Sequence, residues 1–177
     1  MKNYSQIWQD IFVLNVLKNK KNGLFLDIGC GEPIKINNTF LLEKEYDWKG
    51  INIDLNSDYT KLWESSNRIK SKFILHDALT IDYDNLIHNF LKENNKDRID
   101  YLSMDLEPPS ITLEVLKKIP LDKYRFSVIT FEHDLYRNNQ HLLEESRNIF
   151  ENYNYKLAVS NINNQEDWWI DPMVMDV

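Results

Sequence analysis

Short apolar segments alternate along the chain with longer segments in which apolar residues recur every three or four positions. The short segments are strand candidates because they are nearly continuous in apolar residues. They are Leu24–Ile28, Gly50–Ile53, Phe73–Leu75, Tyr101–Met104, Phe126–Phe131 and Tyr155–Val159. The longer segments have helical spacing and are Ser5–Lys18, Thr39–Tyr46, Thr60–Arg68, Asn85–Lys92, Ser110–Ile119 and Asn138–Phe150.

This alternation predicts an α/β fold. Strands that alternate with helices form a mainly parallel sheet, and near-continuous apolar strands indicate that helices cover both faces of the sheet. After the sixth strand the chain reaches Asp167–Met175, which we expect to turn back as an antiparallel edge hairpin. The sequence therefore predicts a doubly wound, Rossmann-like, mainly parallel sheet in a single domain over residues 1–177.

Composition and charge narrow the class of protein. The 177 residues include 42% apolar and 28% charged residues, which is ordinary for a globular protein that builds its own core. The net charge of −7 weighs against binding nucleic acid through phosphate neutralisation. One cysteine excludes an intrachain disulfide, and the sequence shows neither a run of about 20 apolar residues nor a signal peptide. We expect a cytoplasmic protein with no membrane span that binds no nucleic acid.

The residues after each strand carry the candidate chemistry, because ligands of such sheets bind at the carboxyl ends of the strands. The first strand runs into Asp27, Gly29 and Gly31, and the two glycines allow a tight turn and the close approach of a ligand. A dinucleotide site would need a glycine where Ile34 stands, and no P-loop motif is present. Asp27 would suit a cationic group such as the amino group of a methionine moiety. Taken alone, the segment is equally compatible with an ordinary turn between a strand and a helix.

Acidic residues also end the second and third strands. Asp54, followed by Leu55, lies 23 residues after Gly31, close to the offset of about 20 residues at which a carboxylate reaches a ribose diol. Asp77, followed by Ala78, could accept a hydrogen bond from an adenine amino group. Each acid alone would be a helix cap or a solvated turn, but three acids in register at consecutive strand ends indicate a nucleoside site.

The Asp-x-Gly-x-Gly segment together with Asp54 and Asp77 resembles the class I S-adenosylmethionine (SAM)-dependent methyltransferases, and more narrowly the FkbM family of O-methyltransferases. The segments that carry the resemblance are Tyr4-Ser5-Gln6, Gln9-Asp10, Phe25-Leu26-Asp27-Ile28-Gly29, Asn38-Thr39, Trp48-x-Gly50-Ile51, Ile99–Glu107, Glu132-His133 and Asn152–Leu157. Pro33 and the Pro108-Pro109 pair depart from the family pattern. The resemblance implies SAM as the cofactor, held by Asp27, Gly29, Gly31, Asp54, Leu55, Asp77 and Ala78, with Gln6 and Asp10 of the helix over residues 5–18 closing over it.

The fourth and fifth strands are followed by candidate acceptor residues. Methyl transfer to a hydroxyl needs an aligned acceptor oxygen and a base that takes its proton. His133 is one candidate base because histidine titrates near neutrality, and Asp105, with Glu132 beside it, is another. Asp105 could instead join Glu132 or Asp134 in binding Mg²⁺ or Mn²⁺, a layout similar to that of catechol-type O-methyltransferases. A polar loop with a capping aspartate is the alternative without chemistry.

These observations predict a SAM-dependent O-methyltransferase that acts on a hydroxyl of a sugar, a glycan or a similar small acceptor. The alternative is a non-catalytic domain of the same fold that binds SAM or a nucleoside. The prolines after Glu107 invite comparison with amino-methyltransferases of adenine or cytosine, but the aromatic residue that stacks on a flipped base is absent. Trp168 and Trp169 point to opposite faces of a strand, so one of them could stack on a sugar ring, and burial of both as edge-strand aromatics is an equal alternative.

Overall fold

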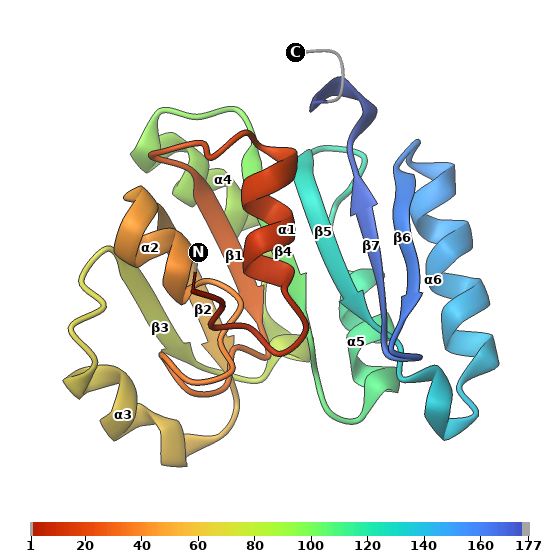
Figure 1. Ribbon diagram of the computed structural model, residues 1–177, viewed down its shortest axis with the longest axis horizontal. Coiled ribbons are helices and arrows are strands. Elements are labelled where there is room, and N and C mark those ends of the chain that lie inside the picture. The colour runs from red at the N-terminus through yellow and green to blue at the C-terminus, as the bar shows by residue number, and fades with distance from the viewer. Residues whose placement is uncertain (1, 175–177) are drawn as a thin grey trace.

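The computed structural model describes residues 2–174, and its centre is one mixed β-sheet (Figure 1). The described strands follow the order β3-β2-β1-β4-β5-β7-β6. Their bounds are β1 (Leu24–Ile28), β2 (Lys49–Asp54), β3 (Ser71–Leu75), β4 (Ile99–Met104), β5 (Phe126–Glu132), β6 (Lys156–Ile162) and β7 (Glu166–Ile170). Strands β1 to β5 pair in parallel, whereas β7 runs antiparallel to both β5 and β6. The predicted mainly parallel sheet with an antiparallel hairpin is confirmed. Met175, the last residue of the predicted return segment, lies outside the described residues.

Helices cover both faces of the sheet, as the continuous apolar strands predict. They are α1 (Gln9–Val16), α2 (Phe40–Tyr46), α3 (Thr60–Ser65), α4 (Tyr83–Asn94), α5 (Pro109–Leu116) and α6 (Gln140–Asn152). In Figure 1, α1 and α2 lie in front of the sheet and α4 and α5 lie behind it. Side chains of β1 pack on both faces of the sheet. Phe25 packs in the core under α1 and α2, and Leu26 packs in the larger core under α4, α5 and α6. Within the described residues, no helix has the length and apolar character needed to cross a membrane.

The N-terminal helix begins later than its spacing predicts, at Gln9 instead of Ser5. The Asp10 carboxylate accepts hydrogen bonds from the backbone N–H of Tyr4 and from the hydroxyl of Ser5, both at 2.9 Å. These bonds fold the preceding segment back on the helix. Trp8, immediately before the helix, has a left-handed backbone with φ 76° and a side chain that is 58% exposed. This conformation is costly for a bulky residue.

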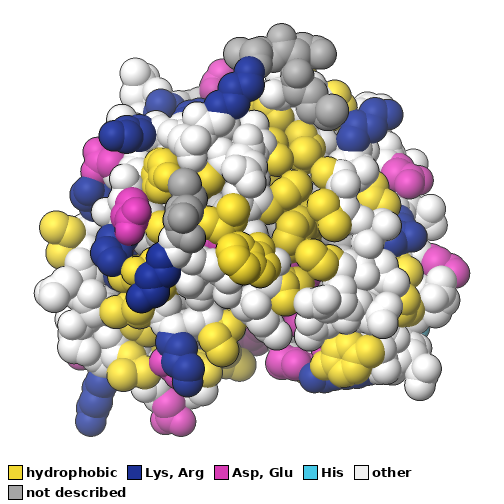
Figure 2. All heavy atoms as spheres, viewed as in Figure 1, with side chains coloured by type: hydrophobic (Ala, Val, Ile, Leu, Met, Phe, Trp, Pro, Cys, Tyr) yellow, Lys and Arg dark blue, Asp and Glu magenta, His cyan; other side chains and the backbone are white. Residues whose placement is uncertain are grey.

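Helix α1 lies on the front face of the sheet, over its centre. Figure 2 shows apolar side chains gathered around α1 and over the strands beside it. Phe12 of α1 contacts Trp168 of β7, with ring centroids 4.6 Å apart. The helix is therefore anchored to β7, whose first residues lie at the edge of the sheet that carries the candidate site.

The edge strand β6 is irregular. Its pairing with β7 shifts register between Leu157 and Val159 and again between Val159 and Ile162. Such bulges bend a strand and increase its twist. Lys156 and Ser160 of β6 are exposed, so one face of this strand points to solvent.

Candidate functional site

The carboxyl ends of the parallel strands meet at one edge of the sheet, where ligands bind in doubly wound folds. Strand β7 runs in the opposite direction, so its first residue lies at this same edge. Glu166, which begins β7, is the register partner of Glu132, which ends β5. The edge therefore gathers the loops that carry the predicted donor and acceptor residues, together with one acidic residue from an antiparallel strand.

The loop after β1, which we call the donor loop (residues 29–33), passes very close to the loop after β4. Gly29 has φ +83°, and a Cβ at this position would lie 1.8 Å from the backbone oxygen of Asp105, so a side chain is excluded here. Gly31 has φ +58°, and the place of its missing Cβ is open space for 4 Å around. The donor loop thus packs tightly against the loop after β4 at Gly29, whereas at Gly31 it leaves space for a ligand.

Asp54 joins the donor loop to the end of β2. Its Oδ2 accepts a hydrogen bond from the backbone N–H of Gly31 at 2.9 Å, and its Oδ1 accepts one from the N–H of Asn56 at 2.8 Å. A carboxylate oxygen can accept more than one hydrogen bond, so Asp54 retains capacity for ligand hydroxyls. Leu55 beside it is 68% exposed and offers an apolar surface at the same edge.

Asp77 and Ala78 follow β3. The Asp77 Oδ1 accepts a hydrogen bond from the backbone N–H of Leu79 at 2.9 Å, so this residue does act as a cap. Ala78 is buried, and its carbonyl accepts a hydrogen bond from the hydroxyl of Tyr83 at 2.9 Å. The cap and the tyrosine fix this turn beside Asp54, and the second Asp77 oxygen leaves a further acceptor at the edge.

The structure places Asp27 in the interior, behind the donor loop, instead of at the open edge. Its carboxylate is buried, accepts a hydrogen bond from the Thr39 hydroxyl at 3.0 Å and is also bonded by the Ser103 hydroxyl. Burial raises the pKa of Asp27 to about 6, although these bonds and the charge of Arg68 act to lower it. The side chain is thus engaged by protein groups, and the geometry does not bring it to a donor amino group.

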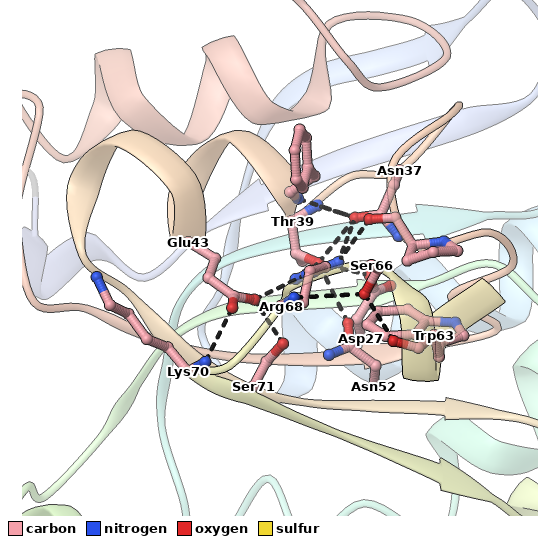
Figure 3. A network of polar contacts seen from close by, with 12 residues as sticks. Asp27, Asn37, Thr39, Glu43, Asn52, Trp63, Ser66, Arg68, Lys70 and Ser71 are labelled. Atoms are coloured by element: carbon pink, nitrogen blue, oxygen red, sulfur yellow. Dashed lines mark hydrogen bonds and ion pairs between the residues drawn. The ribbon is translucent and has the colours of Figure 1, made fainter. Parts of the chain in front are cut away.

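A buried arginine organises this interior region, which we call the donor-side network (Asp27, Asn37, Thr39, Glu43, Trp63 and Arg68; Figure 3). The Arg68 Nε donates to the Glu43 carboxylate at 2.7 Å, in an ion pair whose two side chains are almost fully buried. One Nη donates to the Thr39 hydroxyl at 3.1 Å, which in turn donates to Asp27. The guanidinium also lies 4.7 Å from the ring centroid of Trp63, a cation–π contact.

The same network holds the donor loop from behind. Asn37 Nδ2 donates to the carbonyls of residues 30 and 32, at 3.0 and 2.9 Å. Trp63 Nε1 donates to the carbonyl of residue 31 at 2.9 Å, and Arg68 donates to that of residue 33 at 3.1 Å. Four consecutive carbonyls are therefore turned toward the interior, which fixes the backbone that faces the ligand side.

The N-terminal segment brings different residues to the site than the sequence predicts. Gln6 is exposed, and Asp10 is buried in its bonds to the preceding segment. Gln9, between them, is fully buried: its Oε1 accepts the N–H of Ile7 at 2.9 Å, and its Nε2 donates to Glu166 at 2.6 Å. The contact between helix α1 and the site edge thus runs through Gln9.

Four carboxyl groups converge on the acceptor side of the edge, and we call them the carboxyl cluster (Asp105, Glu132, Asp134 and Glu166). Asp105, after β4, and Glu132, at the end of β5, are hydrogen-bonded to each other. Burial and this contact with Asp105 raise the pKa of Glu132 to about 11, and burial raises the pKa of Asp105 as well. At neutral pH the pair therefore holds a proton on Glu132 and leaves Asp105 as the proton acceptor.

Glu166 extends the cluster from β7. It is buried directly opposite Glu132, and it accepts hydrogen bonds from Gln9 and from the indole N–H of Trp168, the latter at 2.7 Å. Burial, and next the charge of Asp105, raise the pKa of Glu166 to about 8. Trp168 and Trp169 are both buried, so of the two alternatives for this pair the structure favours packing of both rings over stacking of one on a sugar ring.

Asp134 forms the outer part of the cluster with Glu107 and Arg137. Asp134 is buried, and one of its oxygens lies 3.2 Å from the Arg137 guanidinium. Arg137 also makes two hydrogen bonds to Glu107, at 2.9 and 3.0 Å, and is 44% exposed. Oxygen atoms of Glu107, Glu132 and Asp134 lie within 4.8 Å of one another, a spacing that a hard divalent cation could bridge.

His133 lies apart from this cluster. Successive residues of a strand point to opposite faces, and the His133 ring is completely buried beside Asp167, with Nε2 3.7 Å from that carboxylate. Its Nδ1 accepts the backbone N–H of Leu135 at 3.2 Å. The structure therefore does not bring His133 to the open edge with Asp105 and Glu132.

Gln9, Glu166 and Arg68 contribute to the site but were not among the cofactor-binding or catalytic residues predicted from the sequence. Glu166 lies at the edge only because β7 is antiparallel, and the predicted hairpin contained that signal. Gln9 belongs to the same N-terminal motif as Gln6. Arg68 lies in the linker before β3 and carries no sequence signal, because its partners come from distant segments.

No protein-family model matches this sequence, and no curated protein matches it. Solved structures do match. A protein of Clostridium thermocellum, provisionally described as an rRNA methylase, is 13% identical with a TM-score of 0.60, and the match covers 96% of each chain. The fibrillarin pre-rRNA processing protein of Methanococcus jannaschii is 15% identical with a TM-score of 0.56, over 85% of this chain and 67% of that one.

A SAM-dependent methyltransferase of Geobacter sulfurreducens, solved with S-adenosylhomocysteine (SAH), is also similar. It is 16% identical with a TM-score of 0.51, over 90% of this chain and 68% of that one. The comparisons do not single out the FkbM family. What they establish is the architecture: this chain has the fold of the class I SAM-dependent methyltransferases.

Proposed function

We propose that the protein is a SAM-dependent methyltransferase whose donor lies on the donor loop and whose acceptor lies against the Asp105–Glu132 pair. One observation carries the proposal. The open backbone at Gly31 and the carboxyl cluster belong to loops that touch, since Gly29 packs against the Asp105 backbone. A donor on the first loop and an acceptor on the second would therefore meet where the loops join, as a transfer reaction requires.

For the donor, the arrangement supports four of the predicted contacts at the open edge. Asp54 has free acceptor capacity for the ribose hydroxyls, and Asp77 has a free oxygen for the adenine amino group. Leu55 and Ala78 lie beside these acids and supply apolar contact to the adenine ring. Asp27 acts indirectly in this proposal, through the donor-side network that shapes the loop.

For the acceptor, Asp105 is the proposed base. As the methyl group leaves the donor sulfur and bonds to the acceptor oxygen, the hydroxyl proton passes to the Asp105 carboxylate, and SAH leaves with a neutral sulfur. Protonated Glu132 donates to Asp105 and holds it in place. A carboxylate whose pKa is raised by burial is a better base near neutral pH than an exposed one.

His133 takes a supporting role in this proposal. Its Nδ1 accepts the N–H of Leu135, so the ring shapes the turn that carries Asp134. We expect His133→Ala to lower stability more than it lowers the rate of the chemical step. Loss of the pH dependence of turnover in this variant would instead restore the histidine as the base.

A sugar or glycan hydroxyl is the proposed acceptor. Exposed Trp8 precedes Gln9, which bonds the carboxyl cluster, and an indole ring offers a stacking surface for a sugar ring.

Two similar structures are described as acting on rRNA or its precursor, but a net charge of −7 and an acidic edge disfavour a polyphosphate chain as the acceptor. The single cysteine, Cys30, is buried and free, and we propose a cytoplasmic location.

A divalent cation is the alternative to the proton in the cluster. The oxygen atoms of Glu107, Glu132 and Asp134 suit Mg²⁺ or Mn²⁺ in chemistry, but Arg137 already bonds two of these residues and would have to move. Methyl transfer that persists in excess chelator would remove this alternative. Activity that chelator abolishes and Mg²⁺ or Mn²⁺ restores would establish it.

The test of the proposed function combines binding with turnover. Titration calorimetry should show binding of both SAM and SAH to the purified chain, and transfer of a labelled methyl group should identify an acceptor among sugars and glycans. Asp105→Asn should reduce the rate about 10²–10⁴-fold and leave SAH affinity unchanged. Binding of SAH without transfer to any acceptor would favour the non-catalytic alternative, and the absence of binding would refute the proposal.

A further inference from the structure

The carboxyl cluster brings four carboxyl groups together where the described residues supply few counter-charges. Glu132 and Glu166 are buried and face each other across the β5–β7 pair, an arrangement that disfavours ionisation of both groups at once. Asp105 lies against Glu132 and adds a third carboxyl group. Among the described residues of the site, Arg137 contacts the cluster at its outer side, through Asp134, and its side chain is 44% exposed.

Two buried oxygen atoms of the cluster have no hydrogen-bond partner among the described residues, namely Glu132 Oε2 and Asp134 Oδ1. Their side chains are only 7% and 1% exposed. Buried carboxylate oxygens are nearly always bonded, and leaving one without a partner is costly. These atoms therefore point to a positively charged ligand group that approaches the cluster from the edge.

The position of the cluster indicates which group this is. The Asp105 backbone N–H donates to the carbonyl of Ile28 at 2.9 Å, and the Asp105 carbonyl packs on Gly29. The cluster thus begins where the donor loop begins. If the donor lies on that loop, its methylsulfonium, the part that must face the acceptor, is the positive charge presented to the cluster.

We propose that the carboxyl cluster recognises the sulfonium charge, so that the protein binds SAM more tightly than neutral SAH. This inference rests on the proposed function and specifies how its donor site discriminates. During transfer the sulfur gives up its methyl group and becomes neutral, while the acceptor proton passes to Asp105. The cluster thus loses one positive neighbour and gains one proton, and the spent donor loses the interaction that held it.

The test compares three ligands on the wild-type chain by titration calorimetry, with chelator present to exclude divalent cations. They are SAM, SAH, and an analogue in which an amine-bearing carbon replaces the methylsulfonium and carries a positive charge. We expect both cationic ligands to bind at least about 10-fold more tightly than SAH. Equal affinity for all three would overturn the inference while leaving the donor site in place. No binding of any of them would refute the proposed function as well.

Variants test whether the carboxyl cluster causes the preference for cationic ligands over SAH. Asp134→Asn removes a buried carboxylate whose Oδ1 has no partner among the described residues but preserves its shape, and it should reduce the preference for cationic ligands to less than about 3-fold with little change in SAH affinity. Glu114→Gln, an exposed residue of α5, should keep the full preference. If this variant does not fold, Asp105→Asn should reduce the preference. A preference unchanged in a folded cluster variant would contradict the assignment.

Discussion

The donor-side network lies in the interior behind the donor loop, the carboxyl cluster lies on the acceptor side of the site edge, and the two regions differ in how their buried charges are paired. In the network, the Arg68 guanidinium pairs with Glu43. Its other N–H groups donate hydrogen bonds to Thr39, to Asn37 and to a carbonyl of the donor loop. In the cluster, buried carboxyl groups face one another, and two of their oxygens have no partner in the described chain.

The difference assigns a structural role to the donor-side network and a ligand-binding role to the carboxyl cluster. A buried charge with protein partners on every side fixes backbone and side-chain positions, and removing it is strongly destabilising. A buried charge without partners reduces stability and is retained where a ligand completes it. On this reasoning the network shapes the donor loop, and the cluster meets the reacting groups.

The largest effect is expected from breaking the network at its centre. Arg68→Met leaves Glu43 buried without its partner and removes a bond from the donor loop, so we expect a loss of about 3–5 kcal/mol in the free energy of unfolding. Urea unfolding measures it. Arg68→Lys, which keeps the charge but not the forked donors, should lose less. A loss below about 1 kcal/mol for Arg68→Met would contradict a central role for this ion pair.

The next effect concerns donor binding. Asp54→Ala removes the carboxylate that we place against the ribose, and we expect SAH affinity to fall by roughly 1.5–3 kcal/mol, about 10- to 150-fold. Calorimetry measures the change, with Asp58→Ala, an exposed neighbour, as the matched control. Unchanged affinity in a folded Asp54→Ala protein would refute the assignment.

A substitution in the carboxyl cluster should raise the free energy of unfolding, whereas one in the donor-side network lowers it. In the folded chain Glu132 has a pKa of about 11, against 4.5 for an ordinary glutamate. Above pH 4.5 the unfolded chain releases this proton and the folded chain keeps it, so the wild type loses stability as pH rises. Glu132→Gln has no such proton, and we expect it to be more stable than the wild type by about 1–3 kcal/mol at pH 8.

At pH 4 this advantage should disappear, because Glu132 is then protonated in both states. Urea unfolding of both proteins at the two pH values provides the comparison. A Gln variant that is less stable than the wild type at pH 8 would show that the glutamate is ionised and satisfied, and the contrast between the two regions would fail.

The smallest effect is expected at the outer side of the cluster. Arg137 pairs with Glu107 in solvent, where such pairs contribute about 0.2–1 kcal/mol. A double-mutant cycle with Arg137→Met and Glu107→Gln should give a coupling energy in this range at low salt, and 1 M NaCl should reduce it. A coupling above about 2 kcal/mol would mean that Arg137 is an integral partner of the cluster.

Local patterns predicted the framework well. The five parallel strands and the hairpin follow from apolar runs, and the glycines of the donor loop have the positive φ angles expected of a tight turn. The start of α1 was missed because Asp10 bonds backward to Tyr4 and Ser5, which helical spacing does not register. Chemistry alone makes His133 a suitable base, but it follows Glu132 directly at the end of β5, and its ring is buried beside Asp167.

The donor-side network could not be predicted, because Arg68 meets its partners only after distant segments assemble. Asp27 illustrates the same limit. Its place after apolar residues and before a glycine suggested an open carboxylate, whereas the fold encloses it between Thr39 and Ser103. Sequence position identifies the edge of the sheet, but packing decides which side chains reach it.

The irregular edge strand β6 has a consequence for how copies of this chain behave together. An exposed strand edge is a template on which another molecule can add a strand, and regular, flat edges promote such association. The two register shifts in β6 interrupt the row of free backbone groups, and Lys156 places a charge at its start. We therefore expect β6 to resist the addition of a strand from another copy of the chain.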